Sequence, residues 1–195
     1  IAKQIPTYRI PTPAGGGVAA VSVIGEVQVY RIRKGDTLMD LARYYSLGYN
    51  EIVEANPGID PWVPPTGATV LLPTEWVLPC CDYRGVIVNI PEMRIFYMRP
   101  AGDGTTLVST YPVGLGRDDW RTPQGTFRIQ GKTLNPQWNI PPSIREEHIR
   151  ERGDPRTFIP GGAPDNPLGK HRLELSLPMY RIHGTNIPWG VGMQV

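Results

Sequence analysis

A strand, a turn and the start of a helix follow one another in the stretch Tyr30-Arg31-Ile32-Arg33-Lys34-Gly35-Asp36-Thr37-Leu38. The alternation of side chains from Val27 to Ile32 predicts a strand, which the Lys-Gly-Asp turn interrupts. Asp36 or Thr37 can then cap a helix. The apolar positions of that helix have helical spacing; they are Leu38, Leu41, Ala42 and Tyr45.

Two more elements complete this unit. Gly48 is expected to end the first helix, and Tyr49–Ala55 predicts a second helix that stops at Asn56-Pro57-Gly58. Ala68–Leu72 predicts the closing strand, and Pro73 ends it. The order is therefore strand, helix, helix, strand. We assign this small α+β module to residues 26–74.

The composition of the 195 residues favours a turn-rich globular fold, since 40% are hydrophobic, 19% are charged, and glycine and proline number 22 each. That mixture predicts a mostly β protein. The net charge of +2 is too small and too dispersed to indicate nucleic acid as a partner. The apolar stretch Val18–Ile24 is far shorter than the roughly 20 residues of a membrane span, and no signal-peptide pattern is present.

The remaining segments differ in character. Residues 1–25 carry three prolines and three consecutive glycines, which suits an extended lead-in, flexible or docked, rather than a core element. Residues 75–84 form a linker, and short strands follow one another through residues 85–195. Thr133–Asn166 has no clean period and predicts a long functional loop. The predicted strands are Val86–Ile90, Arg94–Met98, Thr106–Pro112, Thr126–Gln130, Arg172–Leu177 and Tyr180–Ile182.

The strand-helix-helix-strand unit resembles a LysM module, a small binder of glycans that contain N-acetylglucosamine. The resemblance rests on Tyr30–Leu38, on Ile52–Ile59 and on Val70–Pro73. In that family the sugar lies in a shallow groove between the Gly-Asp-Thr-Leu loop and the Asn-Pro-Gly turn. The glycan-binding residues implied by the resemblance are Gly35, Asp36, Thr37, Leu38, Asn56, Pro57, Gly58 and Ile59.

Plainer interpretations of the same residues stay open. Leu38 and Ile52 also fit positions in a hydrophobic core. Gly35 and Gly58 can simply supply the backbone geometry of their turns. A degenerate LysM copy can also serve as a spacer that binds no glycan, so the fold of the module and its binding activity are separate hypotheses.

Residues 85–195 resemble the catalytic domain of L,D-transpeptidases of the YkuD type, and in particular the ErfK/YbiS branch of the Gram-negative periplasm. The resemblance implies a β-sandwich catalytic domain behind an N-terminal LysM module, which is a familiar pairing in that branch. The matching blocks occur in one order; they are Gly85–Ile90, Met93–Tyr97, Tyr111–Gly116, Thr122–Phe127, Asn135–Trp138, Pro164–Gly169 and Tyr180–Asn186.

The resemblance also implies the chemistry of a transferase. A cysteine attacks the bond between meso-diaminopimelate and the terminal D-Ala of a peptidoglycan stem tetrapeptide, D-Ala leaves, and a thioester remains. An amine then takes the acyl group, either from another stem's diaminopimelate, which gives a 3-3 cross-link, or from a lysine of an outer-membrane lipoprotein. The family's periplasmic location, its part in cell wall biogenesis and cell shape and its inhibition by carbapenems follow; no cofactor or metal is expected.

His183 is the catalytic candidate within this sequence. The resemblance implies that it lines the acceptor side of the pocket and forms a hydrogen bond near the nucleophile. Gly184 and Thr185 are expected to form the pocket wall. The further candidates for substrate contact are Tyr180, Trp138 and Asn186. A histidine that is merely satisfied at a strand end is the plainer alternative for His183.

The family's nucleophile and its base lie in a Ser-His-Gly-Cys motif a little over a dozen residues after the first histidine. Such a motif matters because a cysteine is only a few per cent ionised near neutral pH without a basic partner. The motif does not occur in the sequence, which ends at Val195. We therefore expect this chain to be a fragment of a longer enzyme, inactive without a following segment, rather than a degenerate enzyme.

The other histidines and the two cysteines are expected to take no part in catalysis. His148 lies in the charged run Arg145–His148, which is typical of a solvated helix face, and His171 opens a predicted strand. Cys80 and Cys81 lie in the linker and are structural or incidental thiols, a metal site, or partners of a disulfide outside this chain. Two alternatives to the transpeptidase remain: a non-catalytic peptidoglycan-binding protein and a hydrolase of the cross-links. The acyl acceptor and the oligomeric state are not indicated.

Overall fold

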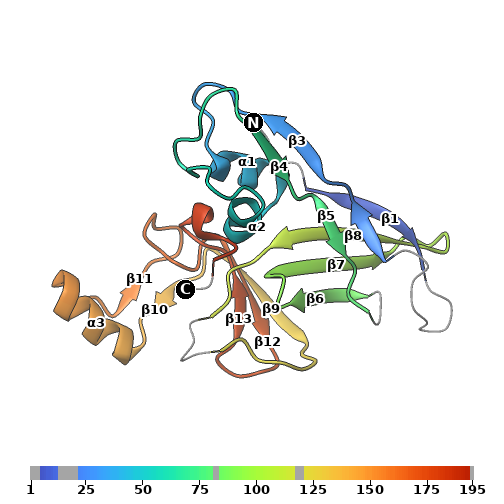
Figure 1. The fold of residues 1–195 in the computed structure, drawn as a ribbon. Coiled ribbons are helices and arrows are strands. Elements are labelled where there is room, and N and C mark those ends of the chain that lie inside the picture. The colour runs from blue at the N-terminus through green and yellow to red at the C-terminus, as the bar shows by residue number, and fades with distance from the viewer. Residues whose placement is uncertain (1–4, 13–21, 81–83, 117–120, 194–195) are drawn as a thin grey trace. The chain divides into compact units, whose positions relative to one another are not determined.

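The structure, a computed structural model, describes residues 5–12, 22–80, 84–116 and 121–193 (Figure 1). The chain divides into two compact units, one comprising Ile1–Thr122 and Trp189–Val195 and the other Pro123–Pro188. Strands outnumber helices among the described residues, so the predicted mostly β class is confirmed. The sandwich arrangement and the incompleteness of the catalytic domain stay predictions. Cys81 lies outside the described residues.

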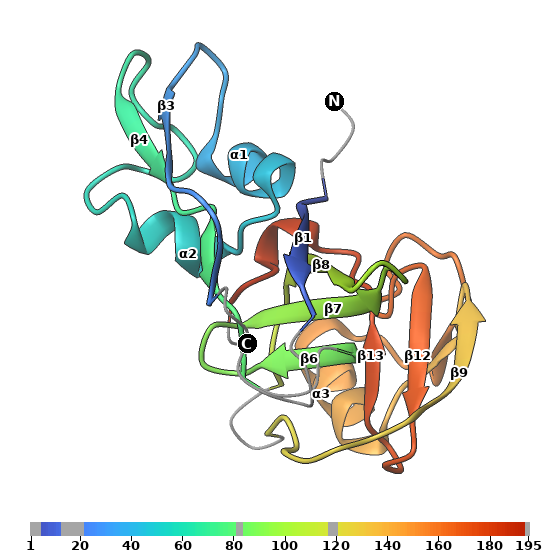
Figure 2. The ribbon, with the colours of Figure 1, turned by 90° about the vertical axis from the view of Figure 1, so that its right-hand side faces the viewer.

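The first unit contains the predicted strand-helix-helix-strand module (Figures 1 and 2). Strands β3 and β4 pair antiparallel, with Tyr30 opposite Val70. Val70 and Leu72 are each 1% exposed, so alternate residues of β4 face the helices of the module. The elements are β3 (Gln28–Arg31), α1 (Leu38–Tyr45), α2 (Tyr49–Glu54) and β4 (Thr69–Leu72).

The two ends of α1 are set by local side-chain and backbone chemistry. The Thr37 hydroxyl accepts a hydrogen bond from the Asp40 N–H at 3.0 Å, so the N-cap is Thr37, one of the two predicted candidates. The prediction that Gly48 ends α1 is wrong. Ser46 ends the helix in a left-handed conformation with a φ of 59°, and Gly48 is the N-cap of α2 instead.

The first unit also contains a four-stranded antiparallel sheet in the order β1-β8-β7-β6. Alternate residues of β7, namely Arg94, Phe96 and Met98, share its buried face. Arg94 is therefore a charged side chain at a core position. The strands are β1 (Thr7–Pro11), β6 (Gly85–Asn89), β7 (Arg94–Pro100) and β8 (Thr105–Pro112).

The LysM-like module is inserted between strands of this sheet, because β1 precedes it in the chain and β6 follows it. Two short strands, β2 (Val23–Gly25) and β5 (Glu75–Val77), pair where the chain enters and leaves the module. The lead-in segment is therefore docked at its described residues. The prediction that it supplies no core residues is wrong for Ile10 and Ile24, which are 3% and 4% exposed.

The second unit holds a three-stranded antiparallel sheet in the order β13-β12-β9. Its strands are β9 (Ile129–Leu134), β12 (His171–Leu175) and β13 (Arg181–His183). The strand predicted at Thr126–Gln130 is therefore displaced toward the C-terminus. Backbone bonding continues past the paired residues, since the Ser176 N–H donates to the Arg128 carbonyl. A 3-10 helix, Pro188–Gly190, follows β13.

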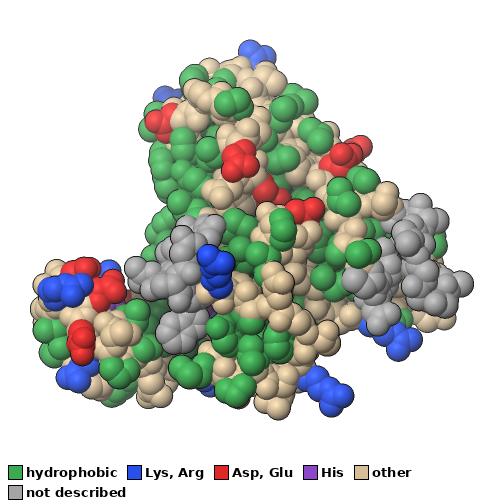
Figure 3. All heavy atoms as spheres, turned by 60° about the horizontal axis from the view of Figure 1, so that its bottom comes forward, with side chains coloured by type: hydrophobic (Ala, Val, Ile, Leu, Met, Phe, Trp, Pro, Cys, Tyr) green, Lys and Arg blue, Asp and Glu red, His purple; other side chains and the backbone are tan. Residues whose placement is uncertain are grey.

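The segment predicted as a long loop, Thr133–Asn166, has secondary structure of its own. It contains β10 (Trp138–Asn139), α3 (Pro142–Arg152) and β11 (Phe158–Ile159), and β10 pairs with β11. Basic and acidic side chains lie intermixed over α3, at the left of Figure 3. The search for apolar periodicity missed this helix, because α3 has no buried residue and therefore no apolar stripe.

An arginine fixes the connection after α3. The guanidinium of Arg156 donates to Asp154 at 2.8 Å and to Asp165 at 2.7 Å. The Arg156 side chain, and next its backbone N–H, hold the pKa of Asp154 at about 2 by hydrogen bonding the ionised carboxylate. The charged cluster therefore joins the end of α3 to the Pro164–Gly169 block.

No helix among the described residues is long and apolar enough to cross a membrane.

Candidate functional site

His183 is the last residue of β13 and is exposed. Its Cα partner on β12 is Arg172. Directly opposite residues of an antiparallel pair project from the same face, so Arg172 and His183 share one face of the sheet. Arg172 donates to Glu174 at 2.6 Å. The sequence pattern gave no sign of this basic neighbour, because it depends on the strand register.

A single hydrogen bond defines the protonation pattern of the His183 ring. Nδ1 lies 2.7 Å from the carbonyl oxygen of Gly184. A carbonyl oxygen only accepts, so Nδ1 must carry the proton in the neutral ring and Nε2 keeps its lone pair. Nε2 of this exposed residue is thus the atom that can take a proton from a thiol or from an ammonium group.

Glycine packing holds the pocket-wall candidates Gly184 and Thr185. Gly169 has a φ of +61°, and a Cβ atom placed there would lie 2.6 Å from the backbone N of Thr185. The backbone of the Leu168-Gly169 turn therefore lies directly against the chain that follows His183. The Thr185 hydroxyl in turn accepts from the Ile187 N–H at 2.9 Å, which fixes the next bend.

Replacing Gly169 by alanine is expected to destabilise the second unit more than the matched change at Gly153. Both residues have a φ near +60°, but a Cβ atom at Gly153 would have no atom within 4 Å. Gly153→Ala should cost about 1–2 kcal/mol from backbone strain alone, and Gly169→Ala should add about 1–3 kcal/mol of overpacking. Denaturant titrations of the two variants measure this difference. Equal costs would show that the glycine contact beside His183 is not tight.

Two of the sequence blocks are joined by one buried side chain. Asn166 is 1% exposed, and its amide donates to the carbonyls of Pro136 and Pro160 at 2.9 Å each. Its side-chain oxygen accepts from the Leu168 N–H at 2.9 Å. The Asn135–Trp138 and Pro164–Gly169 blocks are therefore parts of one local structure.

Among the described residues, no hydrogen bond or ring contact joins the weaker substrate-contact candidates to the His183 side chain. Tyr180 precedes β13 and is half-buried, and Asn186 is half-buried after it. Trp138 lies in β10, and its ring makes an edge contact with His148 at a centroid distance of 6.1 Å. These roles stay predictions.

The prediction of a solvated helix face is wrong for His148. Its helix, α3, is present, but His148 is half-buried against Trp138, and its Nδ1 is enclosed without a hydrogen-bond partner among the described residues. His171 is exposed at the start of β12. Its backbone carbonyl accepts a hydrogen bond from the Gly184 N–H. Cys80 is exposed. No group of three or more His, Cys, Asp or Glu side chains within the described ranges is arranged to hold a metal ion.

The two loops of the LysM-like groove are joined by a backbone hydrogen bond. The Leu38 N–H donates to the Pro61 carbonyl at 2.9 Å, which joins the Gly35–Leu38 loop to the chain after Ile59. Asp36 supports its own turn by accepting from the Tyr30 hydroxyl at 2.9 Å and the Arg33 N–H at 2.8 Å. These contacts fix the two loops between which the sugar groove is predicted.

Several predicted groove residues have supporting contacts of their own. Leu38 and Ile52 are both 0% exposed, so the core interpretation is confirmed for them. Asn56 is 6% exposed and exchanges two hydrogen bonds with the backbone of Leu71, at 2.7 and 2.8 Å. Gly35 and Gly58 have φ of +89° and +82° with open space around them. Pro57 and Gly58 are exposed, and Ile59 is half-buried.

An exposed aromatic residue beside this groove escaped the sequence prediction. Trp62 is 52% exposed, and Val63 next to it is 76% exposed. The Asp60 carboxylate accepts from both of their N–H groups, at 2.8 and 3.0 Å, and these bonds lower the pKa of Asp60. The Asp-Pro-Trp order after the Asn-Pro-Gly turn was the signal that could have identified it.

The architecture defines a class of protein: a small β-α-α-β module inserted in a mostly β domain that presents a histidine at a strand end. Comparison with known families agrees. The model of the L,D-transpeptidase catalytic domain, YkuD, matches residues 83–193, and the LysM domain model matches residues 30–73. The catalytic-domain match covers more than half of the chain, and the chain belongs to the YkuD family of L,D-transpeptidases.

Relatives support the same membership. In Escherichia coli K12, the probable L,D-transpeptidase YcfS is 32% identical over 97% of this chain and 58% of its own length. The probable L,D-transpeptidases YbiS and ErfK/SrfK are 33% and 32% identical over 97% of this chain and 59% and 58% of their lengths. The chain thus spans less than two thirds of these relatives. A solved structure titled as a probable carnitine operon oxidoreductase from Brucella melitensis matches with a TM-score of 0.44 at 24% identity, over 57% of this chain and 69% of that chain, and supports no argument.

Proposed function

We propose that the protein carrying this chain is a periplasmic L,D-transpeptidase that acts on peptidoglycan stem tetrapeptides. The observation that supports this most directly is the His183 ring. Its Nδ1–H is held by the Gly184 carbonyl, which leaves Nε2 as the proton acceptor of an exposed residue at the end of a sheet strand. The family match around it supplies the substrate class.

The proposed reaction runs in two acyl-transfer steps. The thiolate of a Ser-His-Gly-Cys cysteine, a motif that the 195 residues do not contain, attacks the carbonyl of the diaminopimelate–D-Ala bond. The C–N bond breaks and a thioester forms. D-Ala leaves with its amine protonated by the histidine of the same motif, which had taken the proton of the thiol. The acceptor amine loses its proton to a base, for which Nε2 of His183 is our candidate, and attacks the thioester to regenerate the thiolate. The acceptor is a diaminopimelate amine or a lipoprotein lysine.

Acylation by a carbapenem tests this proposal directly. The β-lactam carbonyl is attacked as the stem peptide would be, so the natural protein should gain the mass of one carbapenem in an intact-mass measurement. Replacement of the motif cysteine by serine should abolish the adduct. Absence of an adduct on the unsubstituted protein, together with retained binding to sacculi, would favour the alternative of a non-catalytic peptidoglycan-binding protein. Release of cross-linked peptides without D-Ala exchange would favour the hydrolase.

We further propose that the LysM module binds N-acetylglucosamine-containing glycan. Backbone groups of the Gly35–Leu38 loop and the Pro57–Ile59 turn are placed at a joined pair of loops, as the Leu38–Pro61 hydrogen bond shows. Trp62 extends this surface with an indole that can cover the apolar face of a sugar ring. Leu38 and Asn56 take supporting roles in this proposal, since both are buried.

Replacing Trp62 by alanine is expected to weaken binding of N-acetylglucosamine oligomers about tenfold, because the lost indole contact is worth about 1.4 kcal/mol. Isothermal titration calorimetry measures the change. Trp189→Ala is the control, because Trp189 is also about half exposed, at 48%, but lies outside the module. Unchanged affinity for the Trp62 variant would remove the indole from the proposed groove.

A further inference from the structure

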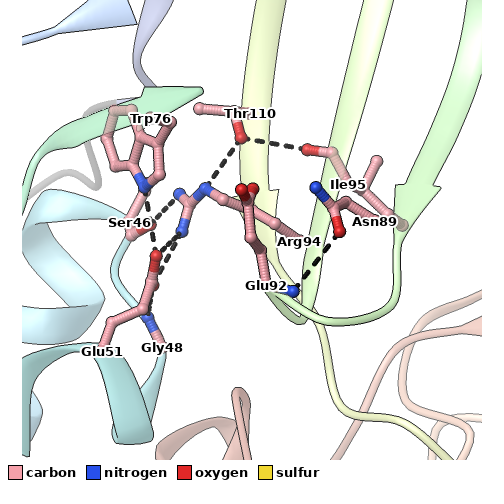
Figure 4. Close-up of polar contacts among 9 residues, drawn as sticks. All are labelled: Ser46, Gly48, Glu51, Trp76, Asn89, Glu92, Arg94, Ile95 and Thr110. Atoms are coloured by element: carbon pink, nitrogen blue, oxygen red, sulfur yellow. Dashed lines mark hydrogen bonds and ion pairs between the residues drawn. The ribbon is translucent and has the colours of Figure 1, made fainter. Parts of the chain in front are cut away.

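A fully buried arginine joins the LysM module to the four-stranded sheet. Arg94 opens β7 and is 0% exposed. Its Nη1 donates to both carboxylate oxygens of Glu51, on α2 of the module, at 2.7 Å each. Its Nη2 donates to the Ser46 carbonyl at 2.6 Å, and its Nε donates to the Thr110 hydroxyl at 2.9 Å (Figure 4). The guanidinium is thus bonded to the module on one side and to the sheet on the other.

The carboxylate of Glu51 collects contacts from a third element as well. The indole N–H of Trp76, on β5, donates to Glu51 Oε1 at 3.1 Å. The guanidinium of Arg94 lies 4.2 Å from the centroid of the same indole ring, in cation–π geometry. Burial lowers the pKa of Arg94, and the charge of Glu51 opposes that shift. The charged pair therefore depends on α2, β5 and β7 being together, and we call Glu51, Trp76 and Arg94 the clamp.

Apolar and backbone packing surrounds the clamp. The hydrophobic core cluster contains residues of the module, such as Ile52, and residues of the sheet, such as Phe96. Gly192 packs so closely on the start of α2 that a Cβ atom there would lie 2.4 Å from the Cα of Gly48. The Tyr49 N–H donates to the Val191 carbonyl at 2.9 Å. A module that hung on a mobile tether would have no such continuous interior.

We propose that Glu51 and Arg94 are positioning residues that lock the LysM module and the β1-β8-β7-β6 sheet into one rigid, cooperative body. The glycan groove is then held at a fixed orientation to the sheet, and glycan binding stabilises the sheet as well as the module. This coupling rests on the proposed glycan-binding function. It goes beyond that function, because a LysM module on a flexible linker would bind glycan without any effect on the sheet.

Hydrogen–deuterium exchange of the natural protein, with and without an N-acetylglucosamine pentamer, tests the coupling. In one cooperative body the most protected amides exchange through opening of the whole body. A ligand at ten times its dissociation constant should then slow exchange about tenfold. We expect this slowing in peptides from α2 and equally in peptides from β7 and β8. In Glu51→Gln, glycan should slow exchange in the module only.

Glu54→Gln is the matched control. Glu54 lies on the same helix and is exposed, and its carboxylate is not part of the clamp. In this variant the pentamer should slow amide exchange in β7 as much as it does in the unsubstituted protein. A merely structural role for Glu51 would speed exchange without separating the two responses. Glycan protection confined to the module in the unsubstituted protein, or still reaching β7 in Glu51→Gln, would overturn the proposal.

Failure of glycan binding has a different signature. If the pentamer slows exchange in no peptide, the proposed glycan binding is wrong. The coupling of the module to the sheet is then tested by exchange rates measured without ligand. Glu51→Gln should then speed exchange in both α2 and β7, because each loses the protection that the opening of one shared body gave it. Faster exchange confined to α2 would overturn the lock.

Discussion

Replacing His183 by alanine is expected to lower the transpeptidation rate of the natural protein about 10²- to 10⁴-fold, the range for loss of a positioned proton-transfer group. The ring is exposed and its hydrogen bond is to the neighbouring Gly184 carbonyl, so the fold should not change. D-Ala release and cross-linked dimer should be measured separately. If Nε2 deprotonates the acceptor amine, dimer formation should fall more than formation of the thioester.

His171→Ala is the control for this experiment. His171 is exposed in the same sheet, and it holds Gly184 through its backbone carbonyl, which the substitution keeps. Its activity should stay within a factor of about two, because a surface substitution away from special features changes little. A His183 variant as active as the His171 variant would return His183 to the plainer interpretation of a satisfied histidine at a strand end.

The local part of this fold could be predicted from the sequence because its signals are local. Thr37 caps α1 through a residue only three positions away, and the spacing of Leu38, Leu41 and Ala42 marks the buried face of that helix. The same holds for the strands of the sheet, where alternation is visible in Arg94–Met98. Gly48 misled because glycine at a helix end and glycine before a helix start look alike in sequence, and Ser46 took the left-handed position.

The features that join the parts could not be predicted, because they depend on residues far apart in the chain. Ile10 looked like part of a loose arm, and its burial follows from pairing of β1 with β8, about 100 residues away. Arg94 looked like the first polar residue of a strand. Its partner Glu51 lies 43 residues earlier, on a helix whose pattern gave that position no distinction. The candidate site shows the same limit, since Arg172 lies opposite His183 only through the register of β12 and β13.

Removing one partner of the buried pair should have the largest effect on stability. Glu51→Gln leaves the charge of Arg94, at 0% exposure, without its counter-ion, and the expected loss in the free energy of unfolding is about 3–5 kcal/mol. The amide of glutamine can still accept from Trp76 but supplies no charge. Chemical denaturation at neutral pH measures the loss, with Glu54→Gln expected to change it by no more than about 0.5 kcal/mol.

Removing both partners should recover much of that loss. In Glu51→Leu with Arg94→Met the uncompensated charge is gone, and buried ion pairs replaced by apolar groups of similar volume are often neutral in stability. The free energy of unfolding of the double variant should therefore exceed that of Glu51→Gln by about 2 kcal/mol or more. The reason is that burying an unpaired charge costs much more than burying an apolar side chain. If the losses in Glu51→Leu alone and in Arg94→Met alone simply added up to the loss in the double variant, the two residues would not interact. The double variant could also be stable while glycan slows amide exchange in α2 but no longer in β7. That result would separate folding from positioning, because the ion pair would then fix the orientation of the module without being needed for folding.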